Sequence, residues 1–287
     1  MGGDVLLMGA VAYDPKVVTI WDGFRAWFAG QGLAFDYLLY SNYERQVEDL
    51  IGGRIHAAWN SPLAWIRAHR LADALGTHVE AAAMRDSDCD LRSLIVVRAD
   101  AGLDTLDALR GRVVGVGAVD SPQATLLPLA HLRDAGLEPG RDFEVRRFDI
   151  GVGLHGDHIG GEREAARALM AGEVDAACMI DANHLAFGRE GTTPTGSTTV
   201  LSATALYDHC NMTIATDRAP AVLVERFRGL LLSMSYADPE VRPLLDLEGL
   251  KQWRPGRRTG YAQLEGAVGA FAFYDEQGRV TADNYRP

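Results

Sequence analysis

The sequence has few cysteines, no run of basic residues and no long apolar segment. Its three cysteines, Cys89, Cys178 and Cys210, are an odd number without CxxC spacing, which argues against a disulfide framework and a zinc knuckle. With 28 Lys and Arg against 39 Asp and Glu, the formal net charge is −11, so a phosphate backbone would be repelled. No apolar run approaches the roughly 20 residues of a membrane helix. We therefore expect neither a nucleic-acid partner nor insertion into a membrane.

A secretory signal is also not evident. The chain starts with Met-Gly-Gly-Asp, without a basic region, and the apolar stretch 5–12 that comes next is short and lacks a cleavage site. We expect a cytoplasmic protein on this evidence, or a periplasmic one if the printed sequence begins after a removed leader.

What the chain does contain is a regular alternation of strand and helix patterns. Hydrophobic content of 47% and charged content of 23% are ordinary for a globular protein. Short β-rich runs occur at 5–13, 35–40, 55–59, 94–98 and 113–117, with helical patterns at 15–30 and 43–51 between them. This alternation predicts an α/β fold with mainly parallel sheets flanked by helices.

One helix–strand unit occurs twice. Residues 44–62 and 163–181 each contain an amphipathic helix, a glycine at its end (Gly53, Gly172) and a strand of small residues that ends in polar ones. The repeat predicts two similar lobes, with ligand-binding residues at the carboxyl ends of their strands. We expect lobe one at 1–98 plus 212–287 and lobe two at 99–211, with the ligand cleft between them.

Three segments resemble a known family. Residues 41–65 ("SNYERQVEDLIGGRIHAAWNSPLAW"), 91–137 and 157–181 ("DHIGGEREAARALMAGEVDAACMID") are similar, in this order, to segments of the phosphate/phosphonate-type substrate-binding proteins of ABC transporters. The resemblance implies the two-lobed type II periplasmic-binding fold. It also implies a small-molecule ligand and an ABC permease as partner.

The turn that holds the oxyanion in phosphonate-binding members differs here. Those members have Ser-Thr-Ser-Gly, whereas this chain has Ser121-Pro122-Gln123-Ala124-Thr125, in which Pro122 lacks an N–H and Ala124 a hydroxyl. Ser121 and Pro122 still suit the start of a helix as N-cap and first residue. An anion would therefore be held by fewer donors, and the Gln123 amide suits a carboxylate or a ring.

The resemblance also implies the residues of the site. From lobe one we expect Tyr13, Ser41, Tyr43, Asn60 and Ser61 at the ligand, and from lobe two Ser121, Gln123, Thr125, His158 and Asp181.

Further polar residues exceed what a receptor for an oxyanion needs. Borderline transition metals take such ligands, and the candidates for a possible divalent metal are His155, Asp157, His158, His184, His209 and Cys210. None of their spacings is a named metal motif. Two functions therefore stay open. The first is a receptor that closes two lobes around a small anionic or zwitterionic molecule. The alternative is a cytoplasmic enzyme of the lyase or decarboxylase type on the same fold, with His158, Asp181 and His209 as catalytic residues.

Overall fold

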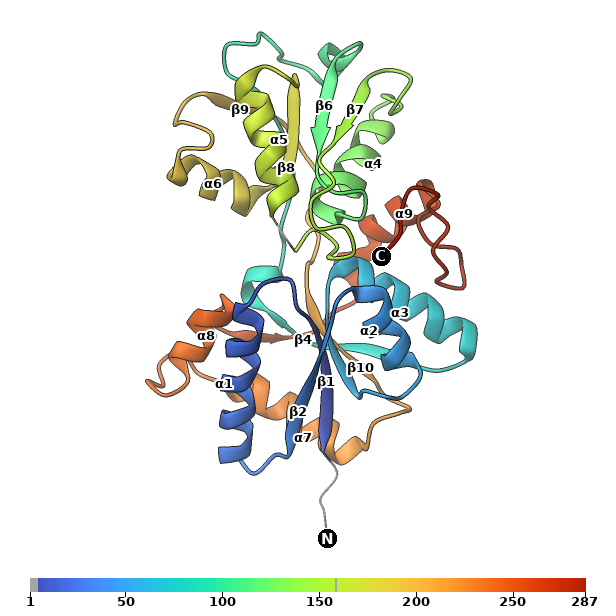
Figure 1. The fold of residues 1–287 in the computed structure, drawn as a ribbon, viewed down its shortest axis with the longest axis vertical. Helices are drawn as coiled ribbons and strands as arrows, with labels where there is room; N and C mark the ends of the chain where they lie inside the picture. The colour runs from blue at the N-terminus through green and yellow to red at the C-terminus, as the bar shows by residue number, and fades with distance from the viewer. Residues whose placement is uncertain (1–4, 158) are drawn as a thin grey trace.

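The computed structural model describes residues 5–157 and 159–287, which form two lobes stacked end to end (Figure 1). The described chain starts at the far end of one lobe and finishes near the junction between the two. None of the helices in the described part of the chain has the length and apolarity needed to span a membrane.

The sheet of lobe one has six strands in the order β11-β4-β10-β3-β1-β2. Its strands are β1 (Leu6–Val11), β2 (Phe35–Tyr40), β3 (Ala57–Asn60), β4 (Val79–Arg85), β10 (Asn211–Ala215) and β11 (Trp253–Pro255). The pairs of β1 with β2 and β3 are parallel, whereas β10 pairs antiparallel with β3 and β4, and β11 antiparallel with β4.

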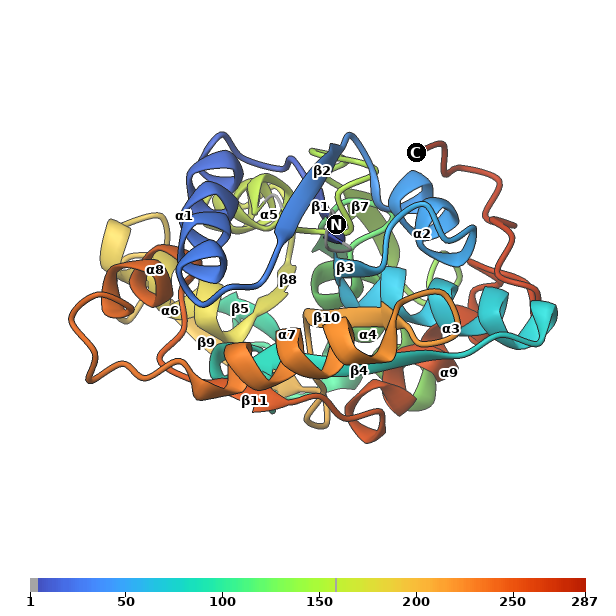
Figure 2. The same ribbon diagram turned by 90° about the horizontal axis from the view of Figure 1, so that it is seen from below.

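Helices cover both faces of this sheet. Helix α1 (Lys16–Gly30), α7 (Ala221–Ser233) and α8 (Arg242–Glu248) contribute to one hydrophobic core, and α2 (Tyr43–Ile51) and α3 (Pro62–Leu75) to another. Viewed from below, α1 and α8 lie on one side of the row of strands and α2 and α3 on the other (Figure 2). Burial on both faces explains why β1 is apolar throughout and why β3 is apolar up to its last residue, Asn60.

The sheet of lobe two has five strands in the order β7-β6-β8-β5-β9. They are β5 (Ser93–Arg98), β6 (Val113–Val116), β7 (Glu144–Arg147), β8 (Ala176–Ile180) and β9 (Thr198–Ala203). Helix α4 (Leu127–Asp134) packs on one face, and α5 (Gly160–Ala171) and α6 (Asp181–Glu190) on the other.

The two-lobed α/β fold predicted from the repeat is confirmed. The units α2–β3 and α5–β8 lie in separate sheets at equivalent positions, because the local order β2-β1-β3 has its counterpart in β7-β6-β8. The expectation of mainly parallel sheets is wrong, since both sheets are mixed. Strands β5 and β10 come directly after crossings from the opposite lobe and run antiparallel to their neighbours.

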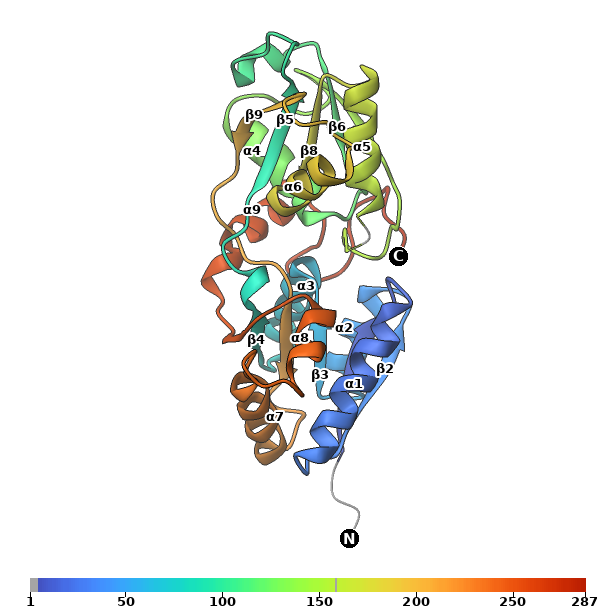
Figure 3. The same cartoon turned by 90° about the vertical axis from the view of Figure 1, so that its left-hand side faces the viewer.

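The lobe boundaries differ from the predicted ones. Strand β5 belongs to the second sheet, so the first crossing comprises residues 86–92 and not 98–100; the second comprises 204–210 (Figure 3). The C-terminal part does not belong to lobe one alone. Helix α9 (Ala262–Ala270) and the residues after it share a hydrophobic core with α3 of lobe one and with the start of α4 in lobe two.

Candidate functional site

A cleft of about 230 Å³ lies where the two lobes meet the crossing segments. Its wall contains four charged side chains, Lys16, Arg85, Asp88 and Asp157. The other residues with side chains along it are Tyr13, Trp59, Ser87, Leu91, Gln123, Ile159, Ile180, Ala182, Asn183, His209 and Cys210. Residues of both lobes therefore meet around one small polar space.

Arg85 is the central cation of the cleft. It is the last residue of β4, and the short 3₁₀ helix η1 (Asp86–Asp88) turns the Asp88 carboxylate back toward it. Arg85 Nε and Nη2 donate to Asp88 at 2.5 and 3.0 Å, and Nη1 donates to the Glu248 main-chain oxygen at 2.9 Å. The guanidinium also lies 5.1 Å from the centre of the Trp59 ring. Four contacts fix this side chain, so Arg85 is a rigid positive charge.

The carboxyl groups around the cleft have pKa values shifted in opposite directions. Burial would raise the pKa of Asp88, but Arg85 lowers it to about 2. Burial raises the pKa of Asp157, and it raises the pKa of Glu248 to about 7 although Arg85 lies beside it. Asp157 and Glu248 therefore lack enough compensating positive charge, and a cation entering the cleft would stabilise their ionised forms.

His209 and Cys210 form the wall at the end of the second crossing. Nδ1 of His209 lies 3.1 Å from the Cys210 sulfur and 3.6 Å from Asp88 Oδ1, while Nε2 lies 3.4 Å from Gln123 Oε1. The Cys210 sulfur is 3.8 Å from Asp157 Oδ1, and Tyr43 donates a hydrogen bond to the same carboxylate. Burial, and then Asp157 and Asp88, raise the pKa of the Cys210 thiol well above its usual value.

Among the described residues that were predicted to contact a ligand, Tyr13 and Gln123 line this cleft. Gln123 donates to the Gly156 carbonyl at 2.8 Å, which fixes its amide with the oxygen toward His209. Tyr43 lies behind the wall, where it holds Asp157.

Four other predicted residues point their polar atoms into the protein. Asn60 accepts from Gln46 and donates to Thr213, and Ser61 caps α3 through the N–H of Ala64. The hydroxyl of Thr125 donates to the Ala118 carbonyl at 2.7 Å. Ser121 is the expected N-cap: it accepts from the Ala124 N–H at 3.2 Å, although the first turn, η3 (Pro122–Leu126), is a π-helix. These hydrogen bonds hold the polar groups of the four residues inside the protein, and none of the four lines the cleft.

The remaining predicted residues are spread over other surroundings. Ser41 is exposed, and Asp181 lies at the first position of α6, where it accepts from its neighbour's N–H. His184 lies 3.1 Å from the Thr198 hydroxyl, and His155 is buried between Ser61 and Glu44. His158 lies outside the described residues. Of the six proposed metal ligands, the structure brings together Asp157, His209 and Cys210.

The sequence interpretation missed Lys16, Trp59, Arg85, Asp88 and Asn183. Strand β4 was not identified, because "VEAAAMR" is rich in alanine and lacks the β-branched pattern of its neighbours. Without β4, nothing placed Arg85 and Asp88 at a strand end. The available signal for a polar site was the segment "RDSDCD", in which Arg85 is followed by acidic residues at every second position.

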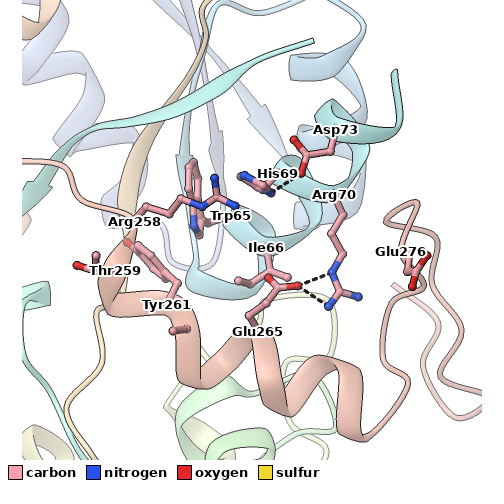
Figure 4. A pocket seen from close by; sticks show the side chains of 11 residues that line it. Trp65, Ile66, His69, Arg70, Asp73, Arg258, Thr259, Tyr261, Glu265 and Glu276 are labelled. Atoms are coloured by element: carbon pink, nitrogen blue, oxygen red, sulfur yellow. Dashed lines mark hydrogen bonds and ion pairs between the residues drawn. The ribbon is translucent and has the colours of Figure 1, made fainter. Parts of the chain in front are cut away.

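A second cavity, of about 710 Å³, lies between α3 and α9 (Figure 4). Two pairs of its polar groups contact each other: Arg70 donates to Glu265 at 2.5 Å, and His69 lies 3.2 Å from Asp73, while Arg258 and Glu276 also line the cavity. It contains no residue predicted from the resemblance. We therefore place the functional site in the smaller cleft between the lobes.

Two lobes of similar topology, joined by two crossings and closed around a small polar cleft, define a bilobal ligand-binding protein. The family model for "ABC transporter, phosphonate, periplasmic substrate-binding protein" matches residues 10–261 of the 287. The chain belongs to this family, which confirms the resemblance found in the sequence. It is thus a substrate-binding component that takes a small molecule and works with a permease, and the family match supports this reading over the alternative enzyme.

Solved structures support the fold. PhnD1 from Prochlorococcus marinus in complex with methylphosphonate is 17% identical, with a TM-score of 0.69 over 94% of this chain and 99% of that one. XAC2383 from Xanthomonas citri bound to ATP is 18% identical (TM-score 0.70; 93% and 97% covered). The aliphatic sulphonate binding protein SsuA from Escherichia coli is 17% identical (TM-score 0.59; 96% and 94% covered). A comparison with curated protein sequences finds no significant match.

Proposed function

We propose that this protein captures a small zwitterionic molecule in the periplasm and delivers it to an ABC permease. The observation that carries the proposal is the charge balance of the cleft. Its wall holds two cations, Lys16 and Arg85, against two acids, Asp88 and Asp157. A dianion would find no net positive charge there, whereas a molecule with one group of each sign finds both partners.

The charged side chains of the cleft offer partners for both signs. Asp157 accepts from Tyr43, and no ion pair involving it occurs among the described residues, so its carboxylate favours the cationic end of a ligand. Lys16 is exposed and likewise has no carboxylate partner within ion-pair distance there; its ammonium lies 5.7 Å from the centre of the Tyr13 ring. Lys16 and Arg85 favour the anionic end.

The size of the cleft limits the ligand. A volume of about 230 Å³ corresponds to roughly eight water molecules at ~30 Å³ each. This is below the usual range of about 300–1,000 Å³ for drug-sized ligands, so we expect a molecule of a dozen non-hydrogen atoms or fewer.

Calorimetric titration with matched ligands tests the proposal. In metal-free buffer, the protein is titrated with a short alkylphosphonate, an alkylsulfonate and the corresponding aminoalkyl compounds. We expect the aminoalkyl compounds to bind at least tenfold more tightly, a difference of about 1.4 kcal/mol. Asp157→Asn should remove this preference, whereas Asp100→Asn, at a carboxylate that is 88% exposed, should preserve it.

Two results would count against the proposal. The first is a preference for the amine-free compounds in the unaltered protein. The second is equal binding of the aminoalkyl compounds by the Asp157→Asn and Asp100→Asn variants, which would place the cationic end elsewhere.

A further inference from the structure

Three donor side chains converge on one side of the cleft, and a fourth lies next to one of them. Asp88 comes from the first crossing, His209 and Cys210 from the second, and Asp157 from the loop before α5. One ligand atom each of Asp88, His209 and Cys210 lies within 4.8 Å of the other two, and all three residues are buried. Asp157 extends the group, because its Oδ1 lies 3.8 Å from the Cys210 sulfur.

The separations among three buried donors suit a metal site. Zinc binds nitrogen and oxygen at about 2.0–2.2 Å and sulfur at about 2.3 Å, so neighbouring donors around it lie roughly 3.3–3.8 Å apart. His209 Nδ1 lies 3.6 Å from Asp88 Oδ1, within this range, and 3.1 Å from the Cys210 sulfur, slightly below it. We propose that Asp88, His209 and Cys210 hold a divalent transition metal ion, with zinc the best fit to the donor set, and that the nearby Asp157 carboxylate faces the remaining coordination position.

Hydrogen bonds from neighbouring residues orient the donors. Gln123 donates its amide N–H to Gly156, so its oxygen faces His209 Nε2 and favours the tautomer with the proton on that nitrogen. The lone pair of Nδ1 then points toward Asp88 and Cys210. Arg85 donates to Asp88 and Tyr43 donates to Asp157, the kind of outer hydrogen bond that orients carboxylate ligands.

The charge of the cluster also favours a metal ion. In and beside the cleft, Asp88, Asp157 and Glu248 supply three carboxyl groups against two cations, Arg85 and Lys16. A divalent ion would compensate the buried carboxylates. It would also give an anionic ligand group a positive partner in a cleft to which the hydroxyls of Ser121 and Thr125 offer no hydrogen bonds. The inference goes beyond the proposed function, which requires no metal.

The test uses the metal ion alone. Protein stripped with a chelator and kept reduced is titrated with Zn²⁺ by calorimetry and with Co²⁺ by absorption spectroscopy, where thiolate coordination gives charge-transfer bands. We expect one equivalent to bind with those bands. Cys210→Ser should abolish the bands and weaken Zn²⁺ binding at least tenfold, and His209→Gln should weaken it similarly.

Cys89→Ser is the matched control. Cys89 is another reduced cysteine of the first crossing, next to Asp88, but its sulfur lies 3.4 Å from the Arg85 carbonyl and it does not line the cleft. This variant should keep both the bands and the affinity. Circular dichroism confirms that each variant is folded.

The outcomes separate this inference from the proposed function. Zn²⁺ binding that is absent, or unchanged in folded Cys210→Ser, overturns the metal site. Binding of the aminoalkyl ligands in metal-free buffer would leave the proposed function intact in that case. Conversely, a metal site of one equivalent without binding of those ligands would support this inference and refute the zwitterion proposal.

Discussion

The buried ion pair between Glu44 and His155 links the two lobes, and its removal gives the most direct test of how they are held together. Glu44 lies on α2 of lobe one and His155 in the loop between β7 and α5 of lobe two. Glu44 Oε1 lies 2.9 Å from His155 Nε2 and accepts from Tyr274 at 2.7 Å. On its other side, His155 Nδ1 lies 2.7 Å from the Ser61 hydroxyl. Both side chains are almost fully buried.

The free energy by which its neighbours stabilise the Glu44 carboxylate follows from the pKa of this group. Burial would raise this pKa, but His155, Tyr274 and Tyr285 lower it from 4.5 to about 2. A difference of about 2.5 units corresponds to roughly 3 kcal/mol. Because the folded-state pKa is lowered, this stabilisation is present above pH 4.5 and is lost as the pH falls toward 2.

His155→Ala leaves the Glu44 carboxylate buried without its cationic partner. We expect the free energy of unfolding to fall by about 3–5 kcal/mol, as for other buried pairs that lose one member. In a Glu44→Gln background no charge is stranded, so the same change should cost at least about 2 kcal/mol less. Urea unfolding at about pH 6, monitored by circular dichroism, measures the single variants, the double variant and their coupling.

His78→Ala is the matched control, because His78 pairs with Asp217 at 2.9 Å on the exposed surface. It should change the free energy of unfolding by less than about 1 kcal/mol. A loss below about 1 kcal/mol for His155→Ala, or a coupling energy below about 0.5 kcal/mol, would show that the pair does not stabilise the junction.

Two further substitutions test how the wall of the cleft is built. Ser121→Ala removes an N-cap, so the free energy of unfolding should fall by about 1 kcal/mol while affinity for the aminoalkyl ligands stays unchanged; a tenfold loss of affinity would mean that the hydroxyl contacts the ligand. Gly156→Ala places a methyl group 2.5 Å from the Ser121 oxygen and 2.6 Å from Gln123 Nε2, at a φ of +79°. It should destabilise the protein by about 1–3 kcal/mol in urea unfolding and weaken ligand binding because Gln123 must move; an unchanged affinity would remove Gln123 from the site.

The fold could be predicted further than the site because its signals are local. The helix of α2 and the strand β2 match their predicted ranges, 43–51 and 35–40, since amphipathic spacing and glycine ends specify them within a few residues. The end of the chain shows the opposite case. Residues 261–275, "YAQLEGAVGAFAFYD", are rich in small and apolar residues that favour a helix, but α9 ends at Ala270, and contacts of Phe273 and Tyr274 with distant residues shape the segment after it.

The site depended on long-range geometry that residue type does not encode. His155, Asp157 and His209 are all metal candidates in the sequence, and His209 is also a catalytic candidate, yet only Asp157 and His209 reach the cleft. His155 has the same chemistry as His209 but faces Glu44 across the junction. Ser121 was correctly identified as a helix cap, and that same hydrogen bond turns its hydroxyl away from the cleft. The sequence thus indicated the capping role of Ser121, but it did not indicate that this role removes the hydroxyl from the ligand site.

The crossings that connect the lobes also carry the chemistry of the cleft, which couples ligand binding to their geometry. They are hydrogen-bonded to each other: Leu91 and Tyr207 exchange two main-chain bonds of 2.8 and 2.9 Å, and the His209 N–H donates to the Asp88 carbonyl at 2.8 Å. These bonds hold Asp88 and His209 at a nearly fixed separation, which a movement of one lobe against the other would not change. Asp157 belongs to lobe two, so a movement of one lobe against the other would change its distance from them. A cation bound by Asp88 and Asp157 together, whether the proposed metal ion or the charged end of the proposed ligand, would therefore bind best to the arrangement that brings the two carboxylates together, and this difference in affinity would favour that arrangement.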